Sequence, residues 1–174
     1  MEFPFDKLRE GIIAIGVNAA SYDKEQAICL KENGESLQTR KDFIWKCYQD
    51  LLLDIAEKIT PLHDMFQLQR KVYCEMFYFL CKEEKPRTVA QKVINHCDIQ
   101  IAMLSGLKLN AKVLGIRDCV QSKEIDGRIM PIEEAAVSDL LPYKACTRLG
   151  GCTCCYVFET MRDENGRLIQ SKIG

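Results

Sequence analysis

Five cysteines between residues 119 and 155 are the feature of this sequence that most directly suggests chemistry. Cys152, Cys154 and Cys155 are almost contiguous, Cys146 lies six residues before Cys152, and Cys119 lies further upstream. Closely spaced thiols can bind a soft metal ion or react with oxidants. The spacing therefore predicts either a metal site or redox chemistry in this part of the chain.

A zinc site is the main interpretation of these cysteines. The segment 152–154 can direct two thiolates at one ion, and Gly150 and Gly151 give the backbone the freedom to form a tight loop. Four thiolates around a tetrahedral zinc ion form a closed, structural site, which has no open position for a substrate. The predicted zinc ligands are Cys119, Cys146, Cys152 and Cys154.

Cys155 is the alternative ligand to Cys154. Adjacent side chains of an extended strand point to opposite faces, so we expect Cys155 to face the small core of this region. Two other interpretations stay open. The cysteines can be small buried core residues, or Cys154 and Cys155 can act in a redox sensor or a cysteine-dependent enzyme, with Arg148 nearby to lower a thiol pKa.

The elements before Gly106 are predicted to be helical. Apolar residues recur there at three- and four-residue spacing, and glycine and proline stand at the joints. A strand is the alternative for residues 12–15, which lie between two glycines. The expected helices run from Phe5 to Asn33-Gly34, from Ser36 to Ile59, from a Thr60 cap and Pro61 to Pro86, and from Thr88 to Gly106.

After Gly106 the pattern changes to that of short strands. We expect strands at residues 111–116 and 128–130, followed by a brief helix that begins near Pro131. Two further strands, at 156–162 and 167–173, should flank a turn at 163–166, because Asn-Gly at its end favours a hairpin. These strands predict a small antiparallel sheet.

The chain is therefore predicted to be an α+β protein. Residues 1–106 should form an up-down helical bundle of about four helices, and residues 107–174 a small, antiparallel, β-rich module that binds zinc. Such a short, loop-rich module has few large apolar side chains to bury, and structural zinc commonly stabilises modules of this kind.

Composition and charge narrow the classes of function. The chain shows neither a basic, apolar leader nor an apolar run of about 18 residues, so we expect a cytoplasmic protein without membrane segments. In a reducing compartment, clustered cysteines favour metal binding or reactive thiols over structural disulfides. The net charge of -1 does not favour nucleic acid. A nucleic-acid interface would have to use Lys144, Arg148, Arg162, Arg167 and Lys172.

A family resemblance rests on residues 119–154. In order, the segment holds Cys119, the run Asp-Gly-Arg at 126–128, Leu-Pro at 141–142, Cys146, and Cys-Thr-Cys at 152–154. It resembles the cysteine-rich tail of phage minor head, or head-morphogenesis, proteins and their bacterial relatives. Ser122 stands where that tail has the second cysteine of a pair, and 143–145 lack its histidine. The resemblance implies a metal-stabilised element of protein assembly and no reaction.

The sequence as a whole thus predicts a non-enzymatic interaction or assembly protein. It contains neither G-x-G-x-x-G nor G-x-x-x-x-G-K, so no phosphate-binding loop is indicated. The expected partner is another protein or a second copy of the chain, and no small-molecule substrate is indicated. The alternatives are the thiol-based sensor or enzyme and the nucleic-acid-binding module described above.

Overall fold

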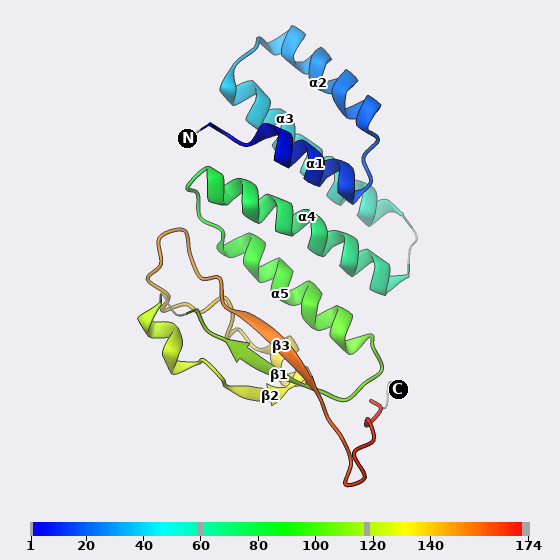
Figure 1. Cartoon of the computed structure of the whole chain (residues 1–174), viewed down its shortest axis with the longest axis vertical. Helices are drawn as coiled ribbons and strands as arrows, with labels where there is room; N and C mark the ends of the chain where they lie inside the picture. The colour runs from blue at the N-terminus through cyan, green and yellow to red at the C-terminus, as the bar shows by residue number, and fades with distance from the viewer. Residues whose placement is uncertain (1, 59–60, 117–118, 172–174) are drawn as a thin grey trace.

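The structure, a computed structural model, describes residues 2–58, 61–116 and 119–171. This part of the chain forms six α-helices, a short 3-10 helix and a three-stranded antiparallel sheet. The predicted α+β class is therefore confirmed. In Figure 1 the first five helices are stacked along the long axis of the molecule, and the sheet lies beyond α5.

The first predicted helix is in fact two. α1 (Phe5–Ile15) ends at Gly16, whose φ of 128° is unfavourable for residues with a side chain. α2 (Ala19–Asn33) begins after Asn18, whose side chain accepts a hydrogen bond from the Ser21 N–H. The prediction of one continuous helix was wrong because this glycine and cap reverse the chain. A strand at 12–15 was also wrong.

The next three helices agree with the prediction apart from their ends. α3 (Leu37–Glu57) is capped by Ser36, and α4 (Leu62–Lys82) follows Pro61, which is the cap and not the first helical residue. The predicted cap at Thr60 lies outside the described residues. α5 (Thr88–Met103) begins at Thr88, so Arg87 is its cap. The described part of residues 1–106 thus holds five helices.

Helices α1 to α4 enclose one apolar core. α4 contacts α1 and α3, while α2 packs mainly on α3 at one end of the molecule and is joined to α1 by the ion pair of Arg9 with Asp23. Aromatic rings cross the centre, where Phe79 lies 5.5 Å from Trp45 and 6.3 Å from Tyr48 between ring centroids. The buried members are Leu8, Ile12, Tyr22, Phe43, Ile44, Tyr48, Ile55, Val72, Met76 and Phe79.

The sheet has the order β2-β1-β3, with both pairs antiparallel. Its strands are β1 (Leu109–Leu114), β2 (Ile129–Pro131) and β3 (Cys155–Thr160). The 3-10 helix η1 (Val120–Glu124) lies between β1 and β2. α6 (Ile132–Val137) follows β2 directly, so the predicted helix start at Pro131 is confirmed.

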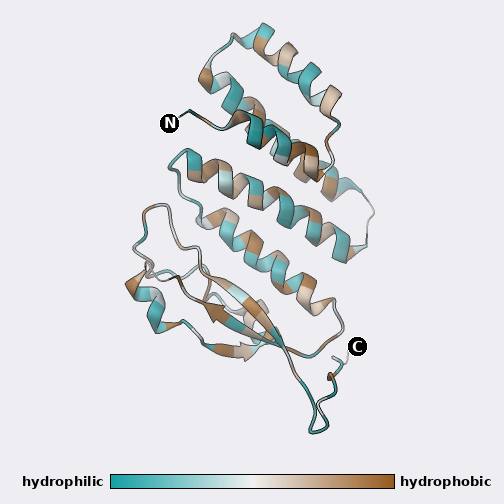
Figure 2. Cartoon of the chain, in the orientation of Figure 1, coloured by the Kyte–Doolittle hydropathy of each residue, from teal (hydrophilic) through white to brown (hydrophobic). Residues whose placement is uncertain are grey.

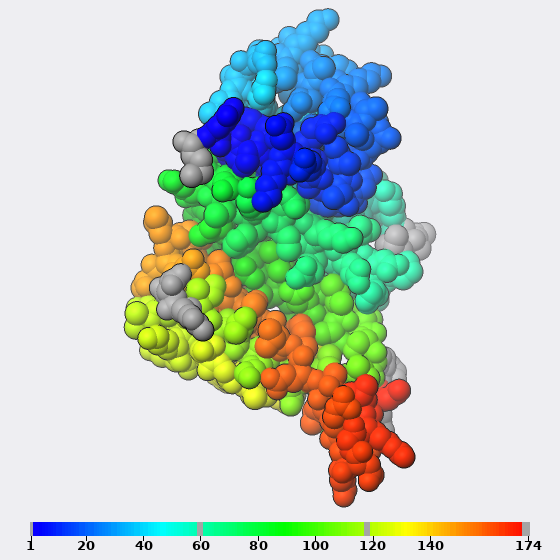
Figure 3. All heavy atoms as spheres, viewed as in Figure 1, coloured from blue at the N-terminus to red at the C-terminus, as the bar shows by residue number. Residues whose placement is uncertain are grey.

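The predicted last strand did not form. Leu168 and Gln170 make only single bridges, to Arg162 and Leu107, and 172–174 lie outside the described residues. The predicted turn at 163–166 is present, and Asp163 Oδ1 accepts hydrogen bonds from the N–H groups of residues 165 and 167. This segment is mainly hydrophilic (Figure 2) and projects from one end of the molecule (Figure 3). It therefore has little apolar surface with which to extend the sheet.

α5 lies between the two parts of the protein. It packs against α4 and also contacts β3 and α6. Its Ile99 belongs to the second apolar cluster, which the inner face of the sheet shares with α6 and the cysteine loop. The domain boundary after Gly106 stays a prediction, and α5 is the element through which the helices position the module.

Candidate functional site

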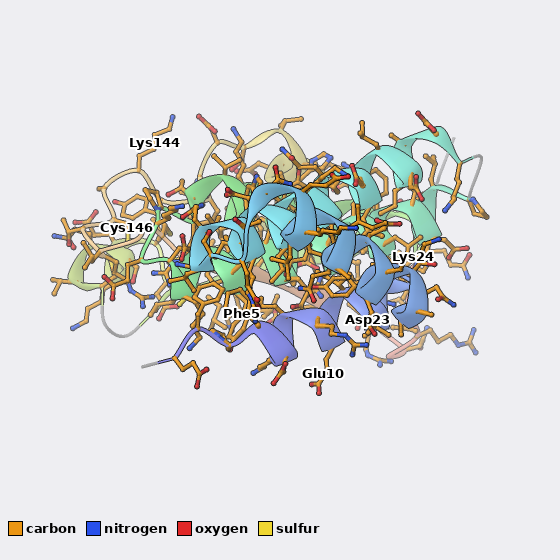
Figure 4. All side chains as sticks on the ribbon, turned by 90° about the horizontal axis from the view of Figure 1, so that it is seen from above. Phe5, Glu10, Asp23, Lys24, Lys144 and Cys146 are labelled. Carbon is orange, nitrogen blue, oxygen red and sulfur yellow. The ribbon has the colours of Figure 1, made fainter. Side chains whose placement is uncertain are left out.

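Four of the five clustered cysteines come together in the structure. The Sγ atoms of Cys119 and Cys146 are 3.5 Å apart. Cys152 Sγ accepts a hydrogen bond from the Cys154 backbone N–H at 3.4 Å, and the Cys152 thiol lies near enough to Cys146 to raise the pKa of that residue. The cysteines form two neighbouring pairs, and these four residues are the predicted zinc ligands. In Figure 4 Cys146 lies among the loops of the module, while Lys144 points away from them.

The pairing of β1 with β3 brings these residues into one corner. Leu114, at the end of β1, is opposite Cys155, at the start of β3. The chain after β1 leads to Cys119, and the chain before β3 contains the segment 152–154, so both segments meet beyond this end of the sheet. β1 and β3 are thus neighbours in the sheet. This pairing gathers cysteines that are distant in sequence.

Backbone N–H groups are directed at three of the four sulfur atoms. Such donors stabilise the charged thiolate form, and they commonly surround thiolates that bind metals. Tyr143 and Cys154 donate to Cys152, at N to Sγ distances of 3.2 and 3.4 Å. The N–H groups of Arg148, beside Cys146, and of Ser122 and Thr147, beside Cys119, favour the charged form of those thiols and so act to lower their pKa values. The local backbone is therefore folded around the sulfur atoms.

The thiols differ in how readily they ionise. Burial opposes ionisation of Cys119, but hydrogen bonds from Cys146 and from backbone N–H groups hold its pKa below the ordinary value. Burial is the largest cause of the raised pKa of both Cys146 and Cys152. Ionisation of one thiol also raises the pKa of its neighbours, since like charges repel. A bound cation would be needed to keep several thiolates together in this cluster.

The fit to zinc is partial. Two thiolates on a tetrahedral zinc are about 3.8 Å apart, given a Zn–S distance of about 2.3 Å, and the Cys119 to Cys146 distance of 3.5 Å is close to this. However, within the described residues no group of three or more His, Cys, Asp or Glu side chains is already arranged to hold a metal ion. The thiols would have to turn from their hydrogen-bonded pairs toward one point.

Cys155 has different surroundings from the other four residues. Burial is the main cause of its raised pKa, followed by the charge of Asp98 on α5. The expectation that Cys155 faces the small core was wrong, because it is Cys154 that belongs to the apolar cluster of the module. Adjacent strand residues do point apart as predicted, but with the two faces exchanged.

Arg87, the cap of α5, and polar side chains of α5 itself hold the cysteine loop, and no sequence motif predicted these contacts. Arg87 donates from its backbone N–H to the Gly150 carbonyl at 2.9 Å, and its guanidinium contacts the carbonyls of Gly150 and Leu149. The buried Asn95 amide donates to the Cys154 carbonyl at 3.2 Å and accepts from Gln91. Polar Gln91 and Asn95, four apart among apolar residues, were the available signal.

Several residues that the two alternative functions would use make other contacts in the structure. The Arg148 guanidinium donates to Thr153 Oγ1 at 2.6 Å, and no contact of it with a thiol is seen among the described residues. Lys144 is paired with Asp139 at 2.5 Å, and Arg162 donates to the Gly166 carbonyl. Lys172 lies outside the described residues. These contacts leave both alternatives as predictions.

No family model, curated protein or solved structure matches the chain. Among the described residues, no helix combines the length and apolar character that crossing a membrane requires.

Proposed function

We propose that this chain is a non-enzymatic interaction or assembly protein of the cytoplasm, in which an up-down helical bundle carries a zinc-stabilised module. The observation that carries the proposal is the collection of four thiols with backbone N–H donors on three of them. A closed four-thiolate site stabilises a fold and offers no open position for catalysis. The proposed ligands are Cys119, Cys146, Cys152 and Cys154.

Zinc accounts for features that ordinary core thiols do not require. A buried neutral thiol behaves as a small apolar group and needs no N–H donors. Here the backbone supplies donors from three separate stretches, near residues 122, 143 and 147. With zinc bound, each donor would stabilise a metal-bound thiolate. Small rotations of the cysteine side chains would replace the thiol pairs by one tetrahedral site.

The interaction surface is assigned to exposed apolar side chains beside the cluster. Leu149 is 94% exposed and lies in the cysteine loop, and Val120 is 71% exposed and follows Cys119 directly. Single exposed apolar residues are common on proteins, but these two stand on the segments that the four thiols hold together. Zinc would therefore fix the surface that meets a partner, which is another protein or a second copy of the chain.

Metal content tests the zinc site directly. Elemental analysis of the purified, full-length protein should give one zinc ion per chain, and thiol titration of the native protein should leave four cysteines unreactive until a chelator is added. Cys119→Ser should lose the metal, whereas Cys97→Ser, a buried cysteine of α5 outside the cluster, should keep it. Protein without zinc, with four freely titrating cluster thiols, would contradict the proposal.

The interaction surface is tested by sedimentation at increasing protein concentration, and by cross-linking to proteins of the source cell. Replacing Val120 and Leu149 by serine should abolish the association in either assay. Leu53→Ser, on the exposed side of α3, is the matched control and should leave it unchanged. Equal association of both variants would show that the partner binds elsewhere.

A further inference from the structure

We propose that a hydroperoxide oxidises Cys119 and Cys146 to a disulfide, and that this bond releases the zinc ion and so switches the interaction surface. The inference rests on the proposed zinc site and adds its regulation. It follows from the distance between the two sulfur atoms, from the unequal exposure of the four thiols, and from their positions in the chain.

Cys119 and Cys146 are already placed to react with one another. Their sulfur atoms are 3.5 Å apart, and a disulfide needs about 2.05 Å, so they must approach by about 1.5 Å. The residues lie 27 positions apart on two separate segments. Each side chain can therefore rotate toward the other without closing a small ring of backbone.

The second pair is less suited to this reaction. Cys152 and Cys154 are separated by a single residue, and the Cys154 N–H is already bonded to the Cys152 sulfur at 3.4 Å. A disulfide between two such residues closes a very small ring, in which the preferred dihedral angle and Cα separation are difficult to reach. Oxidation should therefore select the pair from different segments.

Exposure decides which sulfur meets the oxidant. Cys146 is partly exposed, whereas Cys119, Cys152 and Cys154 are buried. The Cys146 thiolate attacks one oxygen of the peroxide, the O–O bond breaks, and the other oxygen leaves as an alcohol or water after taking a proton. This step gives a sulfenic acid on Cys146, with two electrons passed from its sulfur to the peroxide.

Cys119 then completes the oxidation. Its thiolate attacks the Cys146 sulfur, the new S–S bond forms, and the S–O bond breaks to release hydroxide, which takes a proton to become water. Overall, two thiolates, one peroxide and two protons give one disulfide, one alcohol or water, and one water. The two backbone N–H groups directed at Cys119 hold its sulfur beside Cys146 while this occurs.

The disulfide removes two of the four zinc ligands. Cys152 and Cys154 alone cannot complete a closed tetrahedral site, so the ion should leave. The loop that carries Leu149 then keeps its contacts with Arg87 and Asn95 but loses its attachment through the metal. η1 stays joined to Cys146 through the new bond. The arrangement of Val120 and Leu149 would change, and with it the binding of a partner.

The test uses the full-length, zinc-loaded protein and hydrogen peroxide in a few-fold excess. A chromogenic zinc indicator should report release of one ion per chain, and non-reducing peptide mapping should show a Cys119 to Cys146 cross-link that forms in step with it. Dithiothreitol with added zinc should reverse both signals. Cys155→Ser should behave as the unmodified protein does.

Cys119→Ser separates the two chemical steps. In this variant the sulfenic acid on Cys146 cannot be resolved, so a 1,3-dione probe should label Cys146 and no cross-link should form. Should the purified protein contain no zinc, the proposed zinc site fails, yet the cross-link can still be mapped in the metal-free chain. A different cross-link, or zinc release without any disulfide, would overturn the present inference.

Discussion

Ile44 and Val72 are enclosed between apolar helix faces, and Cys119 and Cys154 are enclosed as fully between loops and short strands. In the helical region each helix satisfies its own backbone groups, and the side chains have only to exclude water. In the module, backbone N–H groups turn inward to sulfur atoms. Burial is thus reached by non-directional packing in the helical region, and by packing together with directional contacts in the module.

This difference has consequences for how each region fails. A packed core loses stability gradually as atoms are removed, because its neighbours can partly relax. A site that depends on several directed donors and one ion loses its order when any part is removed, because the remaining polar groups are left unpaired.

Removal of the proposed zinc ion should separate the two regions most clearly. The apparent free energy of zinc binding in small structural sites is about 10 kcal/mol or more, so a strong chelator should unfold residues 107–171 and leave the helical core intact. Amide hydrogen exchange should show loss of protection in β1 and β3, with α3 and α4 little changed. Uniform loss of protection in both regions would contradict the comparison.

A cavity in the helical core should destabilise the helices and leave the module unaffected. Ile44→Ala should lower the free energy of unfolding by about 2 to 5 kcal/mol, because the Ile44 side chain is fully buried. Chemical denaturation measures the loss, and the zinc content should not change. The exposed Leu53→Ala on α3 serves as the control and should have little effect.

Loss of the Asn95 amide should weaken the attachment of the cysteine loop to α5. Asn95→Ala removes the donor to the Cys154 carbonyl and leaves Gln91 without its acceptor, which should cost about 1 to 3 kcal/mol. Thermal unfolding and zinc retention during chelator titration measure the effect. Asn95→Asp, of similar size but without the N–H donor, should be at least as damaging, and a neutral result for both would remove Asn95 as a support of the loop.

The cysteine loop should also reject a Cβ atom. Gly151 has a φ of 96°, and an added Cβ would overlap the Thr88 hydroxyl, so Gly151→Ala combines backbone strain with a collision. We expect a loss of about 1 to 3 kcal/mol. Gly166→Ala is the matched control, since φ is 76° there but the surrounding space is open. Gly166→Ala should lower the free energy of unfolding by less than Gly151→Ala does. The difference between the melting temperatures of the two variants measures the effect of the collision.

One pH effect on stability should come from the helices. Burial raises the pKa of Glu75 on α4 above its ordinary value of 4.5, with a smaller, opposite effect from Lys7. The stability from a raised pKa is complete below pH 4.5 and is lost as pH rises through the higher value. Denaturation at several pH values should show this decline in the helical transition. Glu75→Gln should flatten it, and an unchanged slope would exclude Glu75 as its source.

Local signals in the sequence predict most of the helices and strands but not the contacts between them. Ser36 and Pro61 marked the starts of α3 and α4 because cap signals are local. Gly16 and Asn18 carried a similar local signal, but the apolar spacing continued across them and concealed the break between α1 and α2. The predicted last strand is absent from the described residues, where this segment makes only two isolated bridges, to Leu107 and Arg162, beside the strands of the sheet.

The α+β class and the positions of most helices and strands follow from the sequence alone, because periodicity and caps are properties of short stretches. The tertiary structure alone shows that Cys154, and not Cys155, packs in the apolar cluster of the module. It alone shows that Arg87 and Asn95 hold the cysteine loop. These outcomes depend on how β1 pairs with β3 and on how α5 packs beside them. Contacts between such distant stretches are set by the fold as a whole.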